Sequence, residues 1–348
     1  MKIKNNLVFF ILLLILIVSS LVSIIISPVK ISVTEVYSVL GDKLFNLHLG
    51  GAIPPSIVDI IWQIRFPRVI LGMVTGMGLS LCGLVMQAIV KNPLADPYIL
   101  GISSGGTLGA TIALFIGNLF FSAFSLSISV SFFAFIGSLV ASLLVFKISS
   151  IGGRITSSKL ILSGVIINFI CIAFSNLIIY LSNNNSAIRL ISEWTMGSLA
   201  GATLGNILLP SVLFILIFLF FKTQYRVLNI MLLGDTTALT LGYNLKTYKK
   251  VYLIIISLLT GVLVASCGLI GFVGLVIPHI TRSLSSTNHK INLKITILLG
   301  GIFLIWADIF SRIILSNAEL PIGILTSLIG APFFLYVMIK KSYSFSEE

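Results

Sequence analysis

Apolar runs about the length of a membrane span follow one another along the whole chain, separated by short stretches rich in glycine, proline or basic residues. A helix needs roughly 20 apolar residues to cross about 30 Å of hydrocarbon. The runs lack the period-two alternation of barrel strands, and backbone amides in lipid must be paired, so helices are predicted. The ten runs cover residues 7–27, 66–90, 94–116, 124–146, 159–181, 206–221, 251–269, 271–283, 295–315 and 324–340.

The polar segments between these runs are short, with two exceptions. Residues 28–63, broken at Pro54-Pro55, are predicted to lie outside the cell membrane, and residues 222–250 are predicted to lie in the cytoplasm. The first run, from Leu7 to Ser27, exceeds the 7–15-residue core of a cleaved signal, so we expect a retained span. Residues 1–348 are therefore expected to form a single all-α polytopic membrane domain.

Basic residues mark the ends of the runs and predict which ends face the cytoplasm. The chain is 57% hydrophobic and 9% charged, with a net charge of +12. The basic residues stand singly, without the aromatic interleaving of a nucleic-acid surface, so we read them as topology signals and expect no nucleic acid. With ten spans and both termini inside, 16 of the 22 are cytoplasmic: Lys2, Lys4, Lys91, Lys147, Arg154, Lys159, Lys222, Arg226, Lys246, Lys249, Lys250, Arg282, Lys290, Lys294, Lys340 and Lys341.

Small residues recur every fourth position on two of the predicted spans. They are Gly72, Gly76 and Ser80 on one, and Gly101, Gly105 and Gly109 on the next. Such a strip lets another helix backbone approach closely, either as static packing or as an interface that shears during transport; we favour packing.

Charge is scarce inside the predicted spans, and no span carries a charged residue at its centre. An ion-coupled carrier usually places such groups near the midplane. Asp308 and Arg312 are four residues apart near an outer end and can pair on one helix face, for structural or functional reasons. Arg65 and Arg68 flank Pro67 just outside the start of a span, as interface anchors or as a dock for acidic groups on a partner.

Two cytoplasmic segments have distinctive patterns. Residues 91–97 carry Pro93 and Pro97, which impose an extended break that suits either a constriction of a transport path or an ordinary tight turn. Residues 228–242 read as two short helices, with Gly234 ending the first, Asp235 capping the second and Gly242 stopping it. Their apolar residues need a cover, either the bilayer surface or a groove on another protein.

Motifs for covalent chemistry are missing from the sequence. It has no GxxxxGK[ST] phosphate loop, no HExxH and no GxSxG, and its three cysteines are dispersed one per apolar run. Of the three histidines, His48 has no partner for a metal site and His279 follows Pro278 near a span end. We therefore expect no enzyme activity, no cofactor and no resident metal.

Taken together, ordered motifs over nearly the whole chain after the first span resemble the FecCD family of permease subunits. These subunits serve type II ABC importers for iron-siderophores, haem and cobalamin. The resemblance rests on Arg65-Phe66-Pro67-Arg68, residues 92–97 (NPLADP), residues 100–105 (LGISSG), Met196-Gly197-Ser198, residues 271–279 (GFVGLVIPH), Ala307-Asp308-Ile309 and residues 319–323 (ELPIG).

The resemblance implies a path between two permease subunits, the second being a copy or a paralogue. Two ATPase subunits would lie beneath and a substrate-binding protein above, with iron(III)-siderophore as the expected cargo and haem or cobalamin as alternatives. By the same resemblance, Arg65, Arg68 and Arg312 would pair with glutamates of the binding protein, with Asp308 positioning Arg312. We expect these pairs to be exposed, contributing about 0–1 kcal/mol each.

Further roles follow from the same resemblance. The segment 228–242 would sit in a groove of the ATPase, through Leu233, Gly234, Asp235, Ala238, Leu241 and Gly242. Asn92, Leu94, Ser157 and Ser158 would form the cytoplasmic gate, although Lys159 stands where an arginine is more familiar. The protein would then be a multi-pass inner-membrane permease working by alternating access. An ion-coupled secondary transporter remains the alternative from another class.

Overall fold

The computed structural model describes residues 2–47, 53–120, 126–152, 156–182, 185–315 and 318–340, and its regular structure there is entirely helical. The elements are α1 (Lys2–Ile25), α2 (Val33–Phe45), α3 (Pro55–Asp59), the π-helix η1 (Ile60–Arg65), α4 (Phe66–Val90), the 3₁₀ helix η2 (Pro97–Leu100), α5 (Ile102–Phe120), α6 (Leu126–Ser149), α7 (Ser157–Ser182), α8 (Asn185–Met196), α9 (Leu208–Thr223), α10 (Tyr225–Leu233), α11 (Asp235–Thr240), α12 (Leu245–Cys267), α13 (Val273–Leu284), α14 (His289–Ile313) and α15 (Ile322–Lys340).

All ten predicted apolar runs have a helical counterpart, which confirms the all-α polytopic prediction. Among the described residues, six helices are long and apolar enough to cross a bilayer alone, and α9 with α10, bent by 61°, makes a seventh. The other three runs correspond to α5, α13 and α15. The start of one run was wrong: residues 94–101 form a turn and η2 rather than helix, since Pro93 and Pro97 interrupt the backbone bonding.

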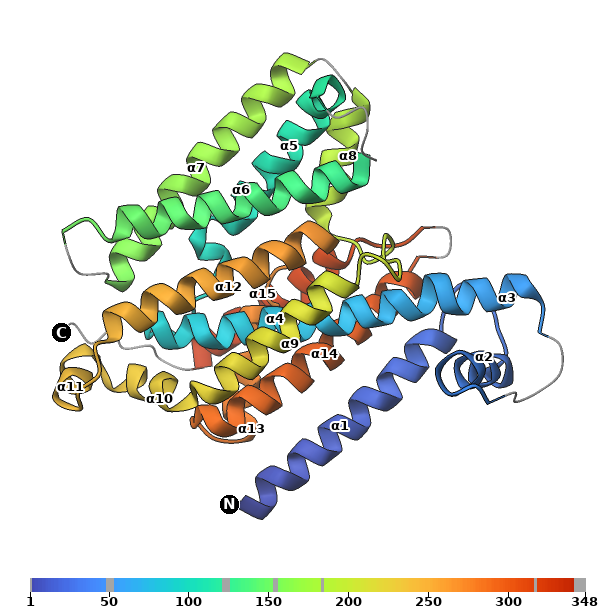
Figure 1. Cartoon of the computed structure of the whole chain (residues 1–348), viewed down its shortest axis with the longest axis horizontal. Helices are drawn as coiled ribbons and strands as arrows, with labels where there is room; N and C mark the ends of the chain where they lie inside the picture. The colour runs from blue at the N-terminus through green and yellow to red at the C-terminus, as the bar shows by residue number, and fades with distance from the viewer. Residues whose placement is uncertain are drawn as a thin grey trace.

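Helix α4 lies at the centre of the bundle, with α9, α12, α13 and α14 packed around it (Figure 1). In its most apolar stretch 89% of residues are buried within the chain, against 28% for α1 and for α7. Helices α1 and α7 therefore form the periphery, where lipid or another subunit supplies the missing contacts.

The helix that contains α4 begins well before the predicted start of its span. Pro55 occupies the first turn of α3, and the chain continues without a break through η1 into α4. Pro67 lies in the first turn of α4 directly after the π-helical segment, so Arg65 and Arg68 lie within a continuous helix and not just outside the start of a span, which corrects that prediction. Arg65, the last residue of the π-segment, has its side chain buried in the bundle.

The two ends of the bundle differ in character, as Figure 1 shows. Helices α10 and α11 protrude at one end, called here the inner end, and α2 and α3 lie at the opposite, outer end. Lys91, at the end of α4, lies 3.7 Å from Asp235 of α11 and so belongs to the inner end, as the charge pattern predicts. Of the basic residues used for that prediction, Arg154 and Lys341 lie outside the described residues.

Both strips of small residues are packing surfaces. A Cβ on Gly76 would overlap the carbonyl of Gly300 on α14, and one on Gly109 would overlap the carbonyl of Phe133 on α6. The backbones of α4 and α14, and of α5 and α6, therefore touch directly. This close approach is the helix contact that the spacing predicts, and whether the interface is static or shears during transport stays a prediction.

Replacing Gly76 by alanine is expected to destabilise the bundle by about 1–3 kcal/mol, since the added methyl group has no space against a rigid backbone. Thermal unfolding of the detergent-purified protein measures the effect. Gly201→Ala is the matched control, because nothing lies within 4 Å of a Cβ there. Equal melting temperatures for the two variants would contradict the backbone contact.

Candidate functional site

At the outer end, three arginines form a buried cluster that holds three helices together. Arg65, Arg68 and Arg312 are 3%, 8% and 3% exposed. Arg68 Nε donates to Asp308 Oδ1 at 3.0 Å, and its two terminal nitrogens donate to the Glu319 oxygens at 3.0 and 2.9 Å. Arg312 Nη2 lies 3.1 Å from Asp308 Oδ2. Such bidentate, charge-assisted bonds are among the stronger ones in proteins.

The same cluster fastens the end of α1. Arg65 Nη1 donates to the carbonyl of Ile24 at 2.7 Å, and Arg312 donates to the carbonyl of Ile26 at 2.9 Å and to Ser23 Oγ at 2.7 Å. The last carbonyls of a helix lack partners within it and carry partial negative charge, so cations cap them well. The arginines are therefore structural ligands of α1 and α14 in this conformation.

The expectation that these arginines are exposed is wrong. They are buried and already paired, and the group at the surface is Glu319, whose side chain is 43% exposed. Asp308 does contact Arg312, as predicted, and it bridges to Arg68 as well. Glu319 was not singled out from the sequence, although it lies in the residues 319–323 that carry the family resemblance. Whether the cluster docks a partner stays a prediction.

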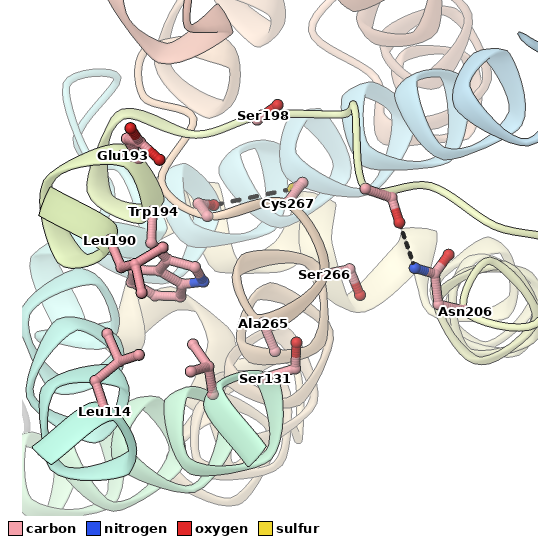
Figure 2. A pocket seen from close by; sticks show the side chains of 13 residues that line it. Leu114, Ser131, Leu190, Glu193, Trp194, Ser198, Asn206, Ala265, Ser266 and Cys267 are labelled. Carbon is pink, nitrogen blue, oxygen red and sulfur yellow. Dashed lines mark hydrogen bonds between the residues drawn. The ribbon is translucent and has the colours of Figure 1, made fainter. Parts of the chain in front are cut away.

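A cavity of about 540 Å³ opens between α5, α6, α8 and α12. Figure 2 shows Trp194 and Leu190 of α8 and Leu114 of α5 pointing into it, with Ser131 and Ser266 across from them. A second cavity of about 610 Å³ shares Ser131 and Ser266 with the first. Both volumes fall in the range of ligand pockets, and their walls are mostly apolar.

Helix α8, which supplies one wall of this cavity, was not predicted. Its 12 residues mix apolar and polar side chains, and Arg189 Nε donates to Glu193 Oε1 at 2.9 Å. A segment this short and this polar lacks the long apolar run by which a membrane span is predicted. Its signal is the spacing of Leu190 and Trp194, four residues apart and therefore on one helix face.

A half-buried carboxylate lies beside the break between α12 and α13. Asp96 Oδ1 accepts a 2.8 Å bond from the Tyr98 amide, and the Tyr98 hydroxyl donates to the carbonyl of Ile270 at 3.1 Å. Both side chains line a cavity of about 430 Å³. Asp96 also neighbours Gly274, which packs against Leu79 and Gly83 of α4, so the loop that carries this acid folds back along the inner half of α4. Sequence reasoning predicted a rigid cytoplasmic turn for this loop and did not single out Asp96.

At the inner end, the predicted pair of short helices is confirmed as α10 and α11. Gly234, with φ of 103°, separates them, and Gly242, with φ of 81°, follows the second. Leu228 and Ala238 are fully buried against the bundle, while other apolar side chains of the pair are exposed. The exposed ones are Leu232 at 46%, Leu233 at 58%, Leu239 at 63% and Leu241 at 54%. The pair thus presents an apolar surface that the described chain leaves uncovered.

Asp235 anchors this pair, but not in the predicted way. It makes no side-chain cap to α11; instead its two oxygens accept bonds from Lys249 Nζ of α12 at 2.8 and 2.9 Å. Partial burial acts to raise the pKa of Asp235, but the bonds and charge of Lys249 and the nearby charge of Lys91 outweigh it, so the pKa lies below its ordinary value. Asp235 is therefore an anionic tether between α11 and α12.

Removing this tether with Asp235→Asn is expected to weaken the packing of α11 by less than about 1 kcal/mol, because the carboxylate is more than half exposed. Since the folded pKa is lowered, the tether is intact above the ordinary carboxyl pKa and is lost as the pH falls below about 4. Limited proteolysis of the 225–242 segment measures this. The wild type should become more susceptible to proteolysis as the pH falls, and Asp235→Asn should show no such increase. An acid-induced increase that persists in Asp235→Asn would contradict the tether.

Of the residues predicted to gate the inner end, three meet around the end of α4. Ser157 Oγ donates to the carbonyl of Val90, and Asn92 Oδ1 accepts the amide of Leu94 at 2.8 Å, fixing that loop. Ser158 is exposed on the first turn of α7. Lys159 donates to the carbonyl of Ile151 at 3.0 Å and closes the loop before α7. The gate role itself is untested and stays a prediction.

In the part of the chain that the structure describes, no three His, Cys, Asp or Glu side chains come together in a way that could hold a metal ion.

The features described above define a polytopic transport permease. They are helices that cross a membrane, a buried central helix, cavities between helices, and an apolar helix pair that is uncovered at one end. The chain belongs to the FecCD transport family, whose model matches residues 13–340.

Several proteins named as permeases are similar to this chain. The uncharacterized ABC transporter permease protein YvrB of Bacillus subtilis is 39% identical over 93% of this chain and 91% of its own length. The hemin transport system permease protein HmuU of Yersinia pestis is 37% identical over 81% and 85%. The vitamin B12 import system permease protein BtuC of Salmonella arizonae is 36% identical over 81% and 83%.

A solved structure described as an inward-facing conformation of a metal-chelate type ABC transporter matches 97% of this chain and 100% of its own, with a TM-score of 0.80 and 31% identity. The PsaBC complex of Streptococcus pneumoniae matches 78% of this chain and 89% of its own, with a TM-score of 0.53 and 19% identity, and supports the fold alone. The fold is therefore that of an ABC transporter permease.

Proposed function

We propose that this chain is the permease subunit of an ATP-driven importer in the cytoplasmic membrane. It works with a second permease subunit, two ATPase subunits and an extracytoplasmic binding protein. The observation that carries the proposal is the uncovered apolar surface of α10 and α11, since four exposed leucines at the inner end need a groove on another protein. An ion-coupled carrier has no use for such a surface.

The proposed mechanism is alternating access driven from this surface. Closure of the ATPases pushes α10 and α11, and the Asp235–Lys249 tether passes the movement to α12. Helix α12 ends beside the cavity of Trp194, so its displacement changes the space between α8 and α5. The loops of Asn92 and Ser157 open or close the inner end. The mostly apolar cavity walls suit a large cargo that must also leave.

Docking of the binding protein is proposed for the outer end. Because Arg68 is bound to Glu319, an acidic group of a partner would reach it only by exchange with that carboxylate. Arg65 and Arg312 are held by helix carbonyls and contribute mainly positive potential. These contacts would orient the partner more than they hold it.

The proposed cargo is an iron(III)-siderophore complex. Relatives named for hemin and vitamin B12, and a neighbour of metal-chelate type, all handle large organic metal complexes. Among cargoes of this class we favour the siderophore, with haem and corrinoids as the competing possibilities.

Stimulation of ATPase activity distinguishes these cargoes. The permease, reconstituted with its ATPase and binding protein, should hydrolyse ATP faster when the binding protein carries a ferric siderophore than when it carries haemin or cobalamin. Stronger stimulation by haemin or cobalamin would overturn the cargo proposal but leave the permease role intact. No stimulation by any loaded binding protein would contradict the permease role itself.

A further inference from the structure

Helix α2, at the outer end, lies crosswise to the helices that span the membrane. Figure 1 shows α2 nearly end-on, whereas α1 and α4 lie along the picture. The link from α1 fixes this direction, because Arg65 donates to the carbonyls of Ile24 and Val29. A capping box between Ser32 and Glu35 then starts α2. A helix that crosses the direction of the spans at the end of the bundle runs along the membrane surface.

Two opposite faces of α2 differ in what they contact. The buried face packs in one cluster with Ile24 of α1 and Ile61 of η1. Its members are Val36, Val39 and Leu40. The face on the other side of the helix is polar, with members four residues apart, namely Thr34, Ser38 and Asp42. The first face therefore meets the bundle, and the second points away from it.

A third side of α2, between these two faces, carries apolar side chains that the described chain leaves half exposed. They are Val33, Tyr37 and Leu44, each 48% exposed, and they are called here the α2 stripe. Their spacing of four and seven residues places them on one side of the helix. At 3.6 residues per turn, this side lies about 90° from the buried face and about 120° from the polar face. Helix α2 is therefore amphipathic beyond what its contact with the bundle requires.

The α2 stripe follows the lipid-facing surface of α1 along the chain. Only 28% of the most apolar stretch of α1 is buried within the chain. Its exposed side chains include Leu14, Val18 and Ile26, which recur at multiples of four residues, and Val29 in the link to α2 is exposed as well. Tyr37 has the apolar ring and polar tip that are enriched where a bilayer meets water. The position of the α2 stripe thus favours lipid as its neighbour.

We propose that α2 is an interfacial helix whose stripe binds the outer leaflet of the lipid bilayer. Amphipathic helices of this kind lie in the plane of the membrane, with the apolar side about 5–10 Å deep at the boundary between headgroups and acyl chains. Val33, Tyr37 and Leu44 enter that boundary, and Thr34 stays in water. Lipid on the stripe and the bonds of Arg65 together hold the link between α1 and α2 in place. This role depends on neither the cargo nor the ATPase.

Spin labels on α2 test which of its sides meets lipid. The three native cysteines are buried, so a label on the full-length protein reports the new cysteine, with unsubstituted protein giving the background. The stripe variants are Val33→Cys, Tyr37→Cys and Leu44→Cys, and the matched control is Thr34→Cys, an exposed position of the same helix. In phosphatidylcholine nanodiscs, the collision rates of each label with oxygen and with a water-soluble nickel chelate are measured. Oxygen concentrates in hydrocarbon, whereas the chelate stays in water.

We expect labels on the α2 stripe to collide severalfold less often with the chelate, and more often with oxygen, than the label of Thr34→Cys. Equal access of the chelate to both sides of the helix would overturn the proposal. Protection of the stripe that arises only when the binding protein is added would also overturn it, because the stripe would then fit a protein partner. Unchanged melting temperatures of the labelled variants confirm that the fold is kept, as the half-exposed positions predict.

Discussion

Replacing Asp308 by alanine is expected to destabilise the protein by about 3–5 kcal/mol, the largest stability loss predicted for a single side chain here. Asp308 is 2% exposed and forms ion pairs with Arg68 and Arg312, both also buried. Among the described residues, its removal leaves two buried guanidinium groups with Glu319 as the one remaining acid paired with them. The cost arises from those uncompensated cations rather than from the lost attraction alone.

Thermal unfolding in detergent measures this loss, with Glu319→Gln as the matched control. Glu319 contacts the same Arg68 but is 43% exposed, so water replaces much of what the substitution removes. We expect the control to cost less than about 1 kcal/mol. If Asp308→Ala cost no more than Glu319→Gln, the buried cluster would not be the element that fastens α1, α4 and α14.

The second large effect that we expect is on the coupling between the permease and its ATPase, not on the stability of the fold. Replacing Leu239 by aspartate should lower the affinity for the ATPase subunit about a hundredfold and abolish ATP-driven uptake. A buried leucine contributes about 1.5–3 kcal/mol, and a carboxylate in its place costs more, so the interface loses at least about 3 kcal/mol. The fold should be unchanged, because Leu239 is 63% exposed in the isolated chain.

Co-purification of the ATPase with the permease measures this affinity. The matched control is Val33→Asp, which makes the same kind of change at a 48% exposed position of α2, at the opposite end of the bundle. It should retain the ATPase at wild-type levels. Undiminished co-purification with Leu239→Asp would place the ATPase contact elsewhere than on α11.

The helices that cross the membrane could be predicted from the sequence because lipid imposes a simple rule on them. Each needs a long apolar run with its backbone bonded internally, and such runs stand out locally in the sequence. The same holds for α10 and α11, where Gly234 and Gly242 have the positive φ angles that glycine accommodates. Local sequence patterns were therefore enough to predict both the spans and the helix pair.

The arrangement of the charges could not be predicted, because it depends on contacts between distant residues. An arginine next to a span end suggests exposure, whereas Arg68 finds Asp308, 240 positions along the chain, and is buried. Likewise, Asp96 lies beside the break between α12 and α13 because its loop folds back against Gly274. Helix α8 was missed for a related reason: its apolar face is completed only by residues of α5, α6 and α12.

Uptake by proteoliposomes tests the central claim most directly. Vesicles holding the permease with its ATPase are supplied outside with the loaded binding protein and, from within, with ATP or a non-hydrolysable analogue. We expect accumulation of the radiolabelled cargo with ATP alone, no accumulation with the analogue, and none by the permease without the ATPase. Accumulation by the permease alone, driven by a membrane potential or an ion gradient without ATP, would contradict the account and favour an ion-coupled transporter.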